Sequence, residues 1–133
     1  MNSLTIWTIG YDARTKEEFL RLLREYAIDV LVDVRRFPKS KIECFSREEL
    51  ESWLPTYGIQ YLWLGEELGG FRRGGYRAFT ETGQFQEAIR RIIEIARNAN
   101  ICIMCVEKNP RACHRRYIAS RLQDLGVRVI HIL

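Results

Sequence analysis

Long hydrophobic runs are missing from this 133-residue sequence, and so are internal repeats and low-complexity tracts. A membrane-spanning helix needs roughly 20 consecutive apolar residues, and no run in the sequence approaches that length. The first four residues, Met1 to Leu4, carry no basic segment and no cleavage-like sequence, so we expect no signal peptide. These features favour a cytoplasmic protein without a membrane partner, formed by a single domain over residues 1–133.

Cysteine is also sparse, with only four residues. A secreted disulfide scaffold would be shorter and richer in cysteine. Cys102 and Cys105 have C-x-x-C spacing, but they lie inside the apolar run Ile101–Val106. Because residues three apart face opposite sides of a strand, this pair is predicted to consist of buried core cysteines, and a metal or redox motif is the less favoured interpretation.

Lysine is scarce, whereas arginine is abundant: the chain has 17 arginines and 4 lysines, with a net charge of +4. The planar guanidinium group binds phosphate or carboxylate with two parallel hydrogen bonds, whereas the lysine ammonium acts as a point charge. The excess of arginine therefore favours an anionic ligand if the arginines gather in one place.

Five apolar runs alternate with amphipathic segments along the chain. Thr15 with Glu18, and Ser46 with Glu49, have the spacing of a capping box at a helix N-terminus. Asn109-Pro110 suits the N-cap and first position of a further helix. The alternation predicts an α/β fold, a single three-layer domain with a mostly parallel five-stranded sheet and helices on both faces, built from Rossmann-like βαβ units. The predicted strands are Leu4–Ile9, Val30–Val34, Ile59–Leu64, Ile101–Val106 and Val127–Leu133.

Ligands of such sheets bind beyond the carboxyl ends of the strands. Polar and glycine-rich segments follow four of the predicted strands, and eight of the 17 arginines besides Arg14 lie in or beside them. The long segment Gly65–Gly75 is predicted to be a loop, and long loops in compact domains usually carry function. We therefore expect an anionic small molecule to be bound by Gly10, Tyr11, Arg14, Arg35, Arg36, Gly69, Gly70 and Arg115.

Four residues are candidates for catalysis: Asp33, Glu107, Cys113 and His114. Asp33 is suited to act as a general base or a metal ligand, or to hold a neighbouring arginine in place. Cys113 is predicted in the first turn of the fourth helix, where the helix dipole and nearby arginines favour a thiolate. His114 is better suited to orient a loop or bind a ligand than to act as a base. No metal is predicted, because the spacing of these residues matches no common zinc pattern.

Four motifs resemble those of the domain-of-unknown-function 488 family. They are Thr8–Tyr11, Val32–Arg35, Leu68–Gly70 and, most specifically, the pattern Cys105-x-Glu-x-x-Pro-x-x-Cys-His-Arg115. Tyr11 stands where a histidine is commoner. The resemblance implies an α/β fold but no activity, and it implies a shared site at Arg14, Asp33, Arg35, Glu107, Cys113, His114 and Arg115.

Three functions remain open from the sequence. The first is an enzyme acting on a phosphorylated or otherwise anionic, nucleotide-like molecule. The second is a nucleic-acid-binding or regulatory module, in which Phe71, Tyr76 and Phe79 stack on bases among arginines. The third is a structural or partner-binding protein that uses the same aromatic loop as an interface. The sequence specifies neither a cofactor nor an oligomeric state.

Overall fold

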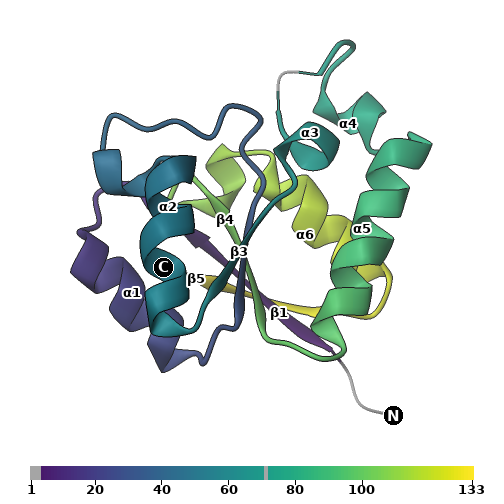
Figure 1. Cartoon of the computed structure of the whole chain (residues 1–133). Coiled ribbons are helices and arrows are strands. Elements are labelled where there is room, and N and C mark those ends of the chain that lie inside the picture. Colours follow the sequence, from purple (N-terminus) through teal and green to yellow (C-terminus); the bar gives the residue numbers. More distant parts are fainter. Residues whose placement is uncertain (1–3, 71) are drawn as a thin grey trace.

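The computed structural model describes residues 4–70 and 72–133 and contains a five-stranded, all-parallel sheet (Figure 1). The sheet order is β3-β2-β4-β1-β5, which confirms the predicted α/β fold. Each strand lies within one residue of its predicted bounds at either end. The strands are β1 Thr5–Gly10, β2 Val30–Asp33, β3 Gln60–Trp63, β4 Ile101–Cys105 and β5 Arg128–Ile132.

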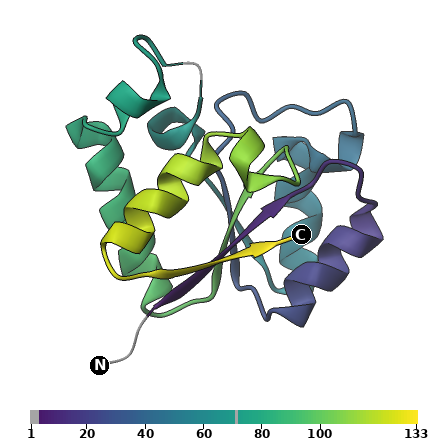
Figure 2. The same ribbon diagram turned by 180° about the vertical axis from the view of Figure 1, so that it is seen from behind.

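Helices cover both faces of the sheet, as expected (Figures 1 and 2). Helices α1 and α2 pack on one face, and α5 and α6 pack on the other. Strand β4 is buried on both sides: Cys102 faces the α1–α2 core and Cys105 faces the α5–α6 core, so the two cysteines point in opposite directions as predicted. The helices are α1 Lys16–Glu25, α2 Arg47–Trp53, α3 Gly65–Leu68, α4 Tyr76–Phe79, α5 Gly83–Ala96 and α6 Arg115–Asp124. None of the helices in the described ranges is long and apolar enough to cross a membrane.

The two predicted capping boxes have different outcomes. The Thr15 hydroxyl accepts a hydrogen bond from the Glu18 N–H at 3.1 Å, so Thr15 is confirmed as the N-cap of α1. The second is wrong, because the Ser46 side chain makes no capping bond to α2. Its hydroxyl instead accepts from the N–H of Ser40 at 3.2 Å and closes the loop between β2 and α2. A tertiary contact has replaced the local cap.

The predicted start of the fourth helix is also wrong. The Asn109 side chain accepts a hydrogen bond from the Arg111 N–H, but the helical turn that it caps is a 3₁₀ turn over Pro110–Ala112. Cys113 is then extended, with φ −139° and ψ 169°, and α6 begins only at Arg115. Cys113 therefore lies just before the helix rather than in its first turn. The backbone N–H of Arg115, at the start of α6, still lowers the pKa of the Cys113 thiol.

The segment predicted as a loop contains one helical turn, α3, and runs directly into a second, α4. The Tyr76 hydroxyl donates a hydrogen bond to the Leu68 carbonyl at 2.7 Å, which ties the two turns together. Phe79 is 7% exposed and belongs to the α5–α6 core, so the prediction that it stacks on bases is wrong. Phe71, the third aromatic of that prediction, lies outside the described residues.

Strand β4 lies between β2 and β1, and this order determines where a ligand fits. The chain leaves β2 towards α2 on one face and leaves β4 towards α6 on the other, so a crevice opens between these two strands. The corresponding space between β4 and β1 is closed by backbone hydrogen bonds from Tyr11 to Cys105 and from Asp12 to Val106. The approach is so close that a Cβ at Gly10 would lie 1.8 Å from a backbone carbonyl oxygen, that of residue 107.

Candidate functional site

The β2–β4 crevice holds a cavity of about 450 Å³ at the carboxyl ends of these strands. Its walls come from the segment after β2, the segment after β4, the start of α6 and the chain around α3 and α4. Six of the predicted site residues line it together: Arg35, Arg36, Gly70, Glu107, Cys113 and His114.

The other predicted residues lie behind this wall or away from it. Gly10 and Gly69 allow close packing of the backbone: a Cβ at Gly69 would lie 2.4 Å from the Cβ of Arg36. The Arg14 side chain turns back on its own segment and donates to the Gly10 carbonyl at 2.7 Å. These positions build the shape of the site without lining its cavity. The same holds for Tyr11, Asp33 and Arg115, which are buried around it.

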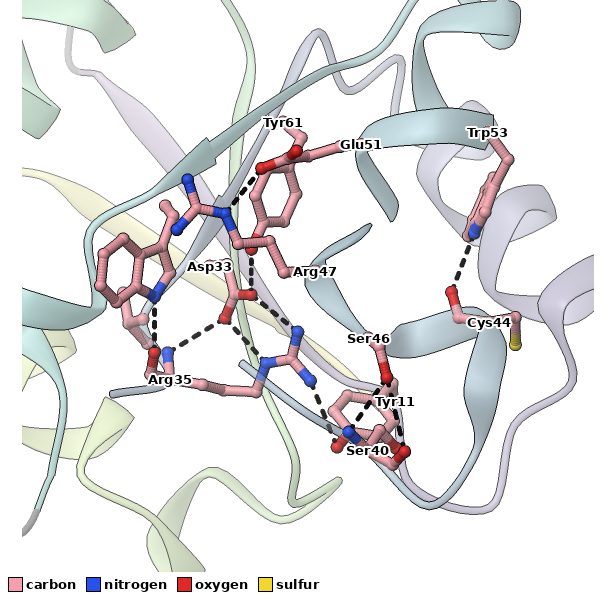
Figure 3. Close-up of polar contacts among 12 residues, drawn as sticks. Tyr11, Asp33, Arg35, Ser40, Cys44, Ser46, Arg47, Glu51, Trp53 and Tyr61 are labelled. Carbon is pink, nitrogen blue, oxygen red and sulfur yellow. Dashed lines mark hydrogen bonds and ion pairs between the residues drawn. The ribbon is translucent and has the colours of Figure 1, made fainter. Parts of the chain in front are cut away.

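Asp33 and Arg35 form a fully buried pair at the end of β2 (Figure 3). The guanidinium donates to both carboxylate oxygens, at 2.9 Å from Nε to Oδ1 and at 2.7 Å from Nη2 to Oδ2. The Arg35 backbone N–H and the Tyr61 hydroxyl donate to the same carboxylate. Of the roles left open for Asp33, this geometry corresponds to the holding of a neighbouring arginine.

The ion pair with Asp33 holds the Arg35 side chain in position, and Arg35 lines the cavity as a charged residue. Burial opposes its charge, but the hydrogen bonds and negative charge of Asp33 outweigh burial and raise the pKa of Arg35 above its ordinary value. The guanidinium also lies over the Tyr11 ring, 5.2 Å from its centroid, and Nη1 is 3.5 Å from the Tyr11 hydroxyl.

Two residues of β3 complete this support and were not predicted. Tyr61 stays protonated because burial and the Asp33 carboxylate raise its pKa, and the Trp63 indole donates to the Arg35 carbonyl at 2.7 Å. Both lie on the same side of β3, which pairs with β2 in parallel register. The spacing of Tyr61 and Trp63 in the sequence indicated that they share one side of a strand. It could not indicate that this strand pairs with β2, because the sheet order was not known.

Cys113 and Cys105 share the floor of the cavity. The neighbouring Cys105 thiol lowers the pKa of Cys113; burial opposes this, and the charge and N–H groups of Arg115 lower the pKa further. The neighbouring Cys113, together with burial, raises the pKa of Cys105. The thiolate of this pair therefore resides on Cys113, while Cys105 carries the proton.

Arg115 is 0% exposed and supplies the charge beneath Cys113. Its Nη2 donates to the backbone carbonyls of Glu107 and Lys108, at 2.7 and 3.2 Å. Its Nε and Nη1 meet no oxygen or nitrogen acceptor in the described part of the chain, and no carboxylate there pairs with it. The charge of this buried guanidinium lowers the pKa of the Cys113 thiol.

His114 joins the start of α6 to the end of β2. Its Nε2 lies 3.0 Å from the Val34 carbonyl oxygen, which requires a proton on that nitrogen. Burial lowers the pKa of His114, so the ring is neutral near pH 7 and Nδ1 is an acceptor. Nδ1 faces Gly70, where a Cβ would come within 3.5 Å of it. His114 thus orients this segment, as expected, and presents a basic nitrogen to the same wall.

Further arginines and aromatic rings form the outer part of the cavity, and most were not predicted. Arg111, Arg116, Phe37, Tyr76 and Tyr117 line it. The Arg116 guanidinium lies 4.7 Å from the centroid of the Tyr117 ring and donates to its hydroxyl, which lowers the pKa of that hydroxyl. The cavity therefore has four guanidinium groups and one carboxylate, that of Glu107, in its lining.

The comparisons with known proteins agree with the motifs. Residues 15–75 and 71–122 match the family described as Domain of unknown function DUF488. The chain belongs to the DUF488 family. The match includes both segments that line the crevice, after β2 and after β4, and it begins after the Thr8–Tyr11 motif. No curated protein matches the chain. In the described part of this DUF488 protein, no group of three or more His, Cys, Asp or Glu side chains is placed to hold a metal ion.

Proposed function

We propose that this protein is an enzyme that binds a small phosphorylated or otherwise anionic molecule in the β2–β4 crevice and attacks it with Cys113. The observation that carries the proposal is the combination of a thiolate-stabilising site with four arginines in one cavity. Guanidinium groups from different segments can bind phosphate oxygens in several directions. A simple electrostatic binder would need no activated thiol among them.

The reaction would be a displacement at an electrophilic centre of the bound anion. The Cys113 sulfur forms a bond to that centre, and the bond to the leaving group breaks with its electron pair. Water then releases the group from sulfur, and its proton passes to a base of the cavity. Glu107 and Nδ1 of His114 both lie on that wall. Asp33 acts through Arg35 as a positioning residue rather than on the substrate.

Binding is tested first with pyrophosphate as the probe. A ligand at 100 times its Kd adds about 2.7 kcal/mol of stability, which corresponds to a rise in Tm of roughly 10 °C for a chain of this size. Arg116→Gln removes one charge of the cavity without breaking a buried ion pair, and we expect it to reduce the shift. Arg128→Gln is the matched control, because Arg128 is exposed at the amino end of β5 and lies outside the cavity.

Chemistry is tested separately by mass spectrometry of the tryptic peptide that contains Cys113. Incubation with p-nitrophenyl phosphate should leave a phosphoryl group on this cysteine, and Cys113→Ser should still bind pyrophosphate but form no thiol adduct. Pyrophosphate binding with neither an adduct nor release of p-nitrophenol would reduce the proposal to an anion-binding protein. The absence of binding, adduct and p-nitrophenol release together would overturn it.

The second candidate is a nucleic-acid-binding module. The observation that favours it is Phe37, which is 64% exposed at the rim of the cavity, next to Arg36. An exposed ring beside guanidinium groups can stack on a base. A Tm shift with short RNA but not with pyrophosphate, which falls steeply as salt increases, would favour this function over the enzyme.

A further inference from the structure

The two cavity cysteines form a pair that the catalytic proposal uses only in part. Cys113 would be the nucleophile, but Cys105 contributes a second thiol that lines the same cavity and belongs to the core cluster against which Cys113 packs. The other cysteines lie elsewhere: Cys102 is on the opposite face of the sheet, and Cys44 packs against the α1–α2 core. Two thiols that line one cavity, one half-buried and one buried, have the arrangement of a nucleophilic and a resolving cysteine.

We propose that Cys113 and Cys105 are a peroxide-sensitive dithiol that closes reversibly to a disulfide. The Cys113 thiolate attacks one oxygen of a peroxide, the O–O bond breaks, and a sulfenic acid forms while the other oxygen leaves as hydroxide or alkoxide. The Cys105 sulfur then attacks the sulfenic sulfur. An S–S bond forms, the sulfenic hydroxyl leaves, and with the Cys105 proton it becomes water. Two thiols are oxidised and one peroxide is reduced.

The local structure supports each step. Both cysteines line the cavity, but Cys113 is half-buried, so a small peroxide can reach it, whereas Cys105 is only 4% exposed. Arg115 stabilises the attacking thiolate. The pKa of Cys105 is raised by the neighbouring Cys113 and by burial, so this thiol keeps the proton that the leaving hydroxyl will need.

Closure requires the two sulfurs to approach to a bond of about 2.05 Å. Cys105 is the last residue of β4 and is held by the sheet. Cys113 lies in the extended link between the 3₁₀ turn and α6, and it can shift without breaking a helix. Closure would remove the thiolate from Arg115 and block the nucleophile. The disulfide itself requires no anionic ligand, so this inference does not depend on the proposed function.

The test is peptide mapping of the whole, reduced protein after brief treatment with hydrogen peroxide and alkylation with iodoacetamide. Trypsin places Cys113 in the peptide 112–115 and Cys105 in the peptide 98–108, together with Cys102. We expect these two peptides to be linked by a disulfide that dithiothreitol reverses. Cys102→Ala should retain the link, which assigns it to Cys105, and Cys44→Ala is the matched control at a half-buried cysteine outside the cavity.

In Cys105→Ala, the linked pair should be lost, and Cys113 should instead be trapped by dimedone as a sulfenic acid. Linked peptides that disappear in Cys102→Ala, or sulfinic acid on Cys113 of the unsubstituted protein without any linked pair, would overturn the proposal. Should Cys105→Ala not fold, the unsubstituted protein and Cys102→Ala still decide the question. Pyrophosphate binding is measured on the reduced protein, so its failure leaves the disulfide result intact.

Discussion

Replacement of Asp33 by asparagine should destabilise this protein far more than its small change in shape suggests. The substitution leaves Arg35 charged, buried and without a carboxylate, and it turns an amide NH2 towards Arg35 Nη2 and the Tyr61 hydroxyl, which are both donors. Removing one partner of a buried ion pair costs about 3–5 kcal/mol. The matched control is Glu51→Gln, since the Arg47–Glu51 pair has side chains that are 42% and 46% exposed, and such pairs contribute about 0–1 kcal/mol.

Urea denaturation measures both losses. With a slope of about 2 kcal/mol per molar urea, Asp33→Asn should lower the midpoint by roughly 2 M, whereas Glu51→Gln should hardly move it. The double variant Asp33→Leu with Arg35→Met should recover much of the loss, because it removes both buried charges. A loss below about 1 kcal/mol for Asp33→Asn, similar to that of the exposed pair, would refute the assignment of Asp33 as the partner that holds Arg35.

Two further predictions test the backbone and the thiol. Gly10→Ala should destabilise the protein by about 3 kcal/mol or more in the same urea assay, because its Cβ would lie 1.8 Å from the Glu107 backbone oxygen. The control is Gly83→Ala in α5, whose Cβ would meet nothing within 4 Å, and it should be neutral or stabilising by up to about 1 kcal/mol. Equal effects of the two substitutions would contradict the close approach of Gly10 to the Glu107 backbone. Alkylation of Cys113 by iodoacetamide should reach half its maximal rate at a lower pH than that of Cys44, since burial raises the pKa of Cys44 while the neighbouring Cys105 thiol and Arg115 lower the pKa of Cys113. Peptide-level mass spectrometry at a series of pH values measures both rates, and the reverse order would contradict the assigned thiolate.

The sheet was predictable because each strand is marked by its own apolar run, and five such runs repeat the same pattern along the chain. An apolar run such as Ile101–Val106 is long enough to form a strand and bears no polar side that water could solvate, so its burial follows from composition. Because an amphipathic helical segment lies between successive strands, each helix can cross over the sheet and return the chain to a strand parallel to the first. The carboxyl-end rule predicted residues of which six line one cavity, although it could not say which pair of strands would open.

The details of the site depend on contacts between distant segments, and these decided where prediction failed. Ser46 has the composition of an N-cap, yet Ser40 competes for its hydroxyl. Cys113 follows a capped turn, yet the chain extends there to bring His114 to the Val34 carbonyl, a contact across 80 residues. Tertiary contacts of this kind override local helix propensity, and they cannot be predicted from a short stretch of sequence because their partners lie far away in the chain.

Arg14 provides the sharpest test of where the ligand binds. The family resemblance implies that it belongs to the site, but in the structure it follows β1, on the closed side of β4, and does not line the cavity. Its Nη2 is buried without an acceptor in the described part of the chain. Burial lowers the pKa of Arg14, Glu18 opposes this, and the charge of Arg115 lowers it again. Arg14→Met removes that repulsion and the unsatisfied donor, at the loss of one charge-assisted hydrogen bond to Gly10.

These contributions oppose one another, because an unsatisfied buried donor costs about 1–3 kcal/mol and the hydrogen bond contributes about 1.5–3 kcal/mol. We therefore expect the stability of Arg14→Met to stay within about 1 kcal/mol of the parent protein, and its Tm shift with pyrophosphate to be unchanged. Arg116→Gln should lose part of that shift under the same conditions. If Arg14→Met also lost the pyrophosphate shift, the anion would have to bind between β1 and β4, and the backbone closure seen there would have to open in solution.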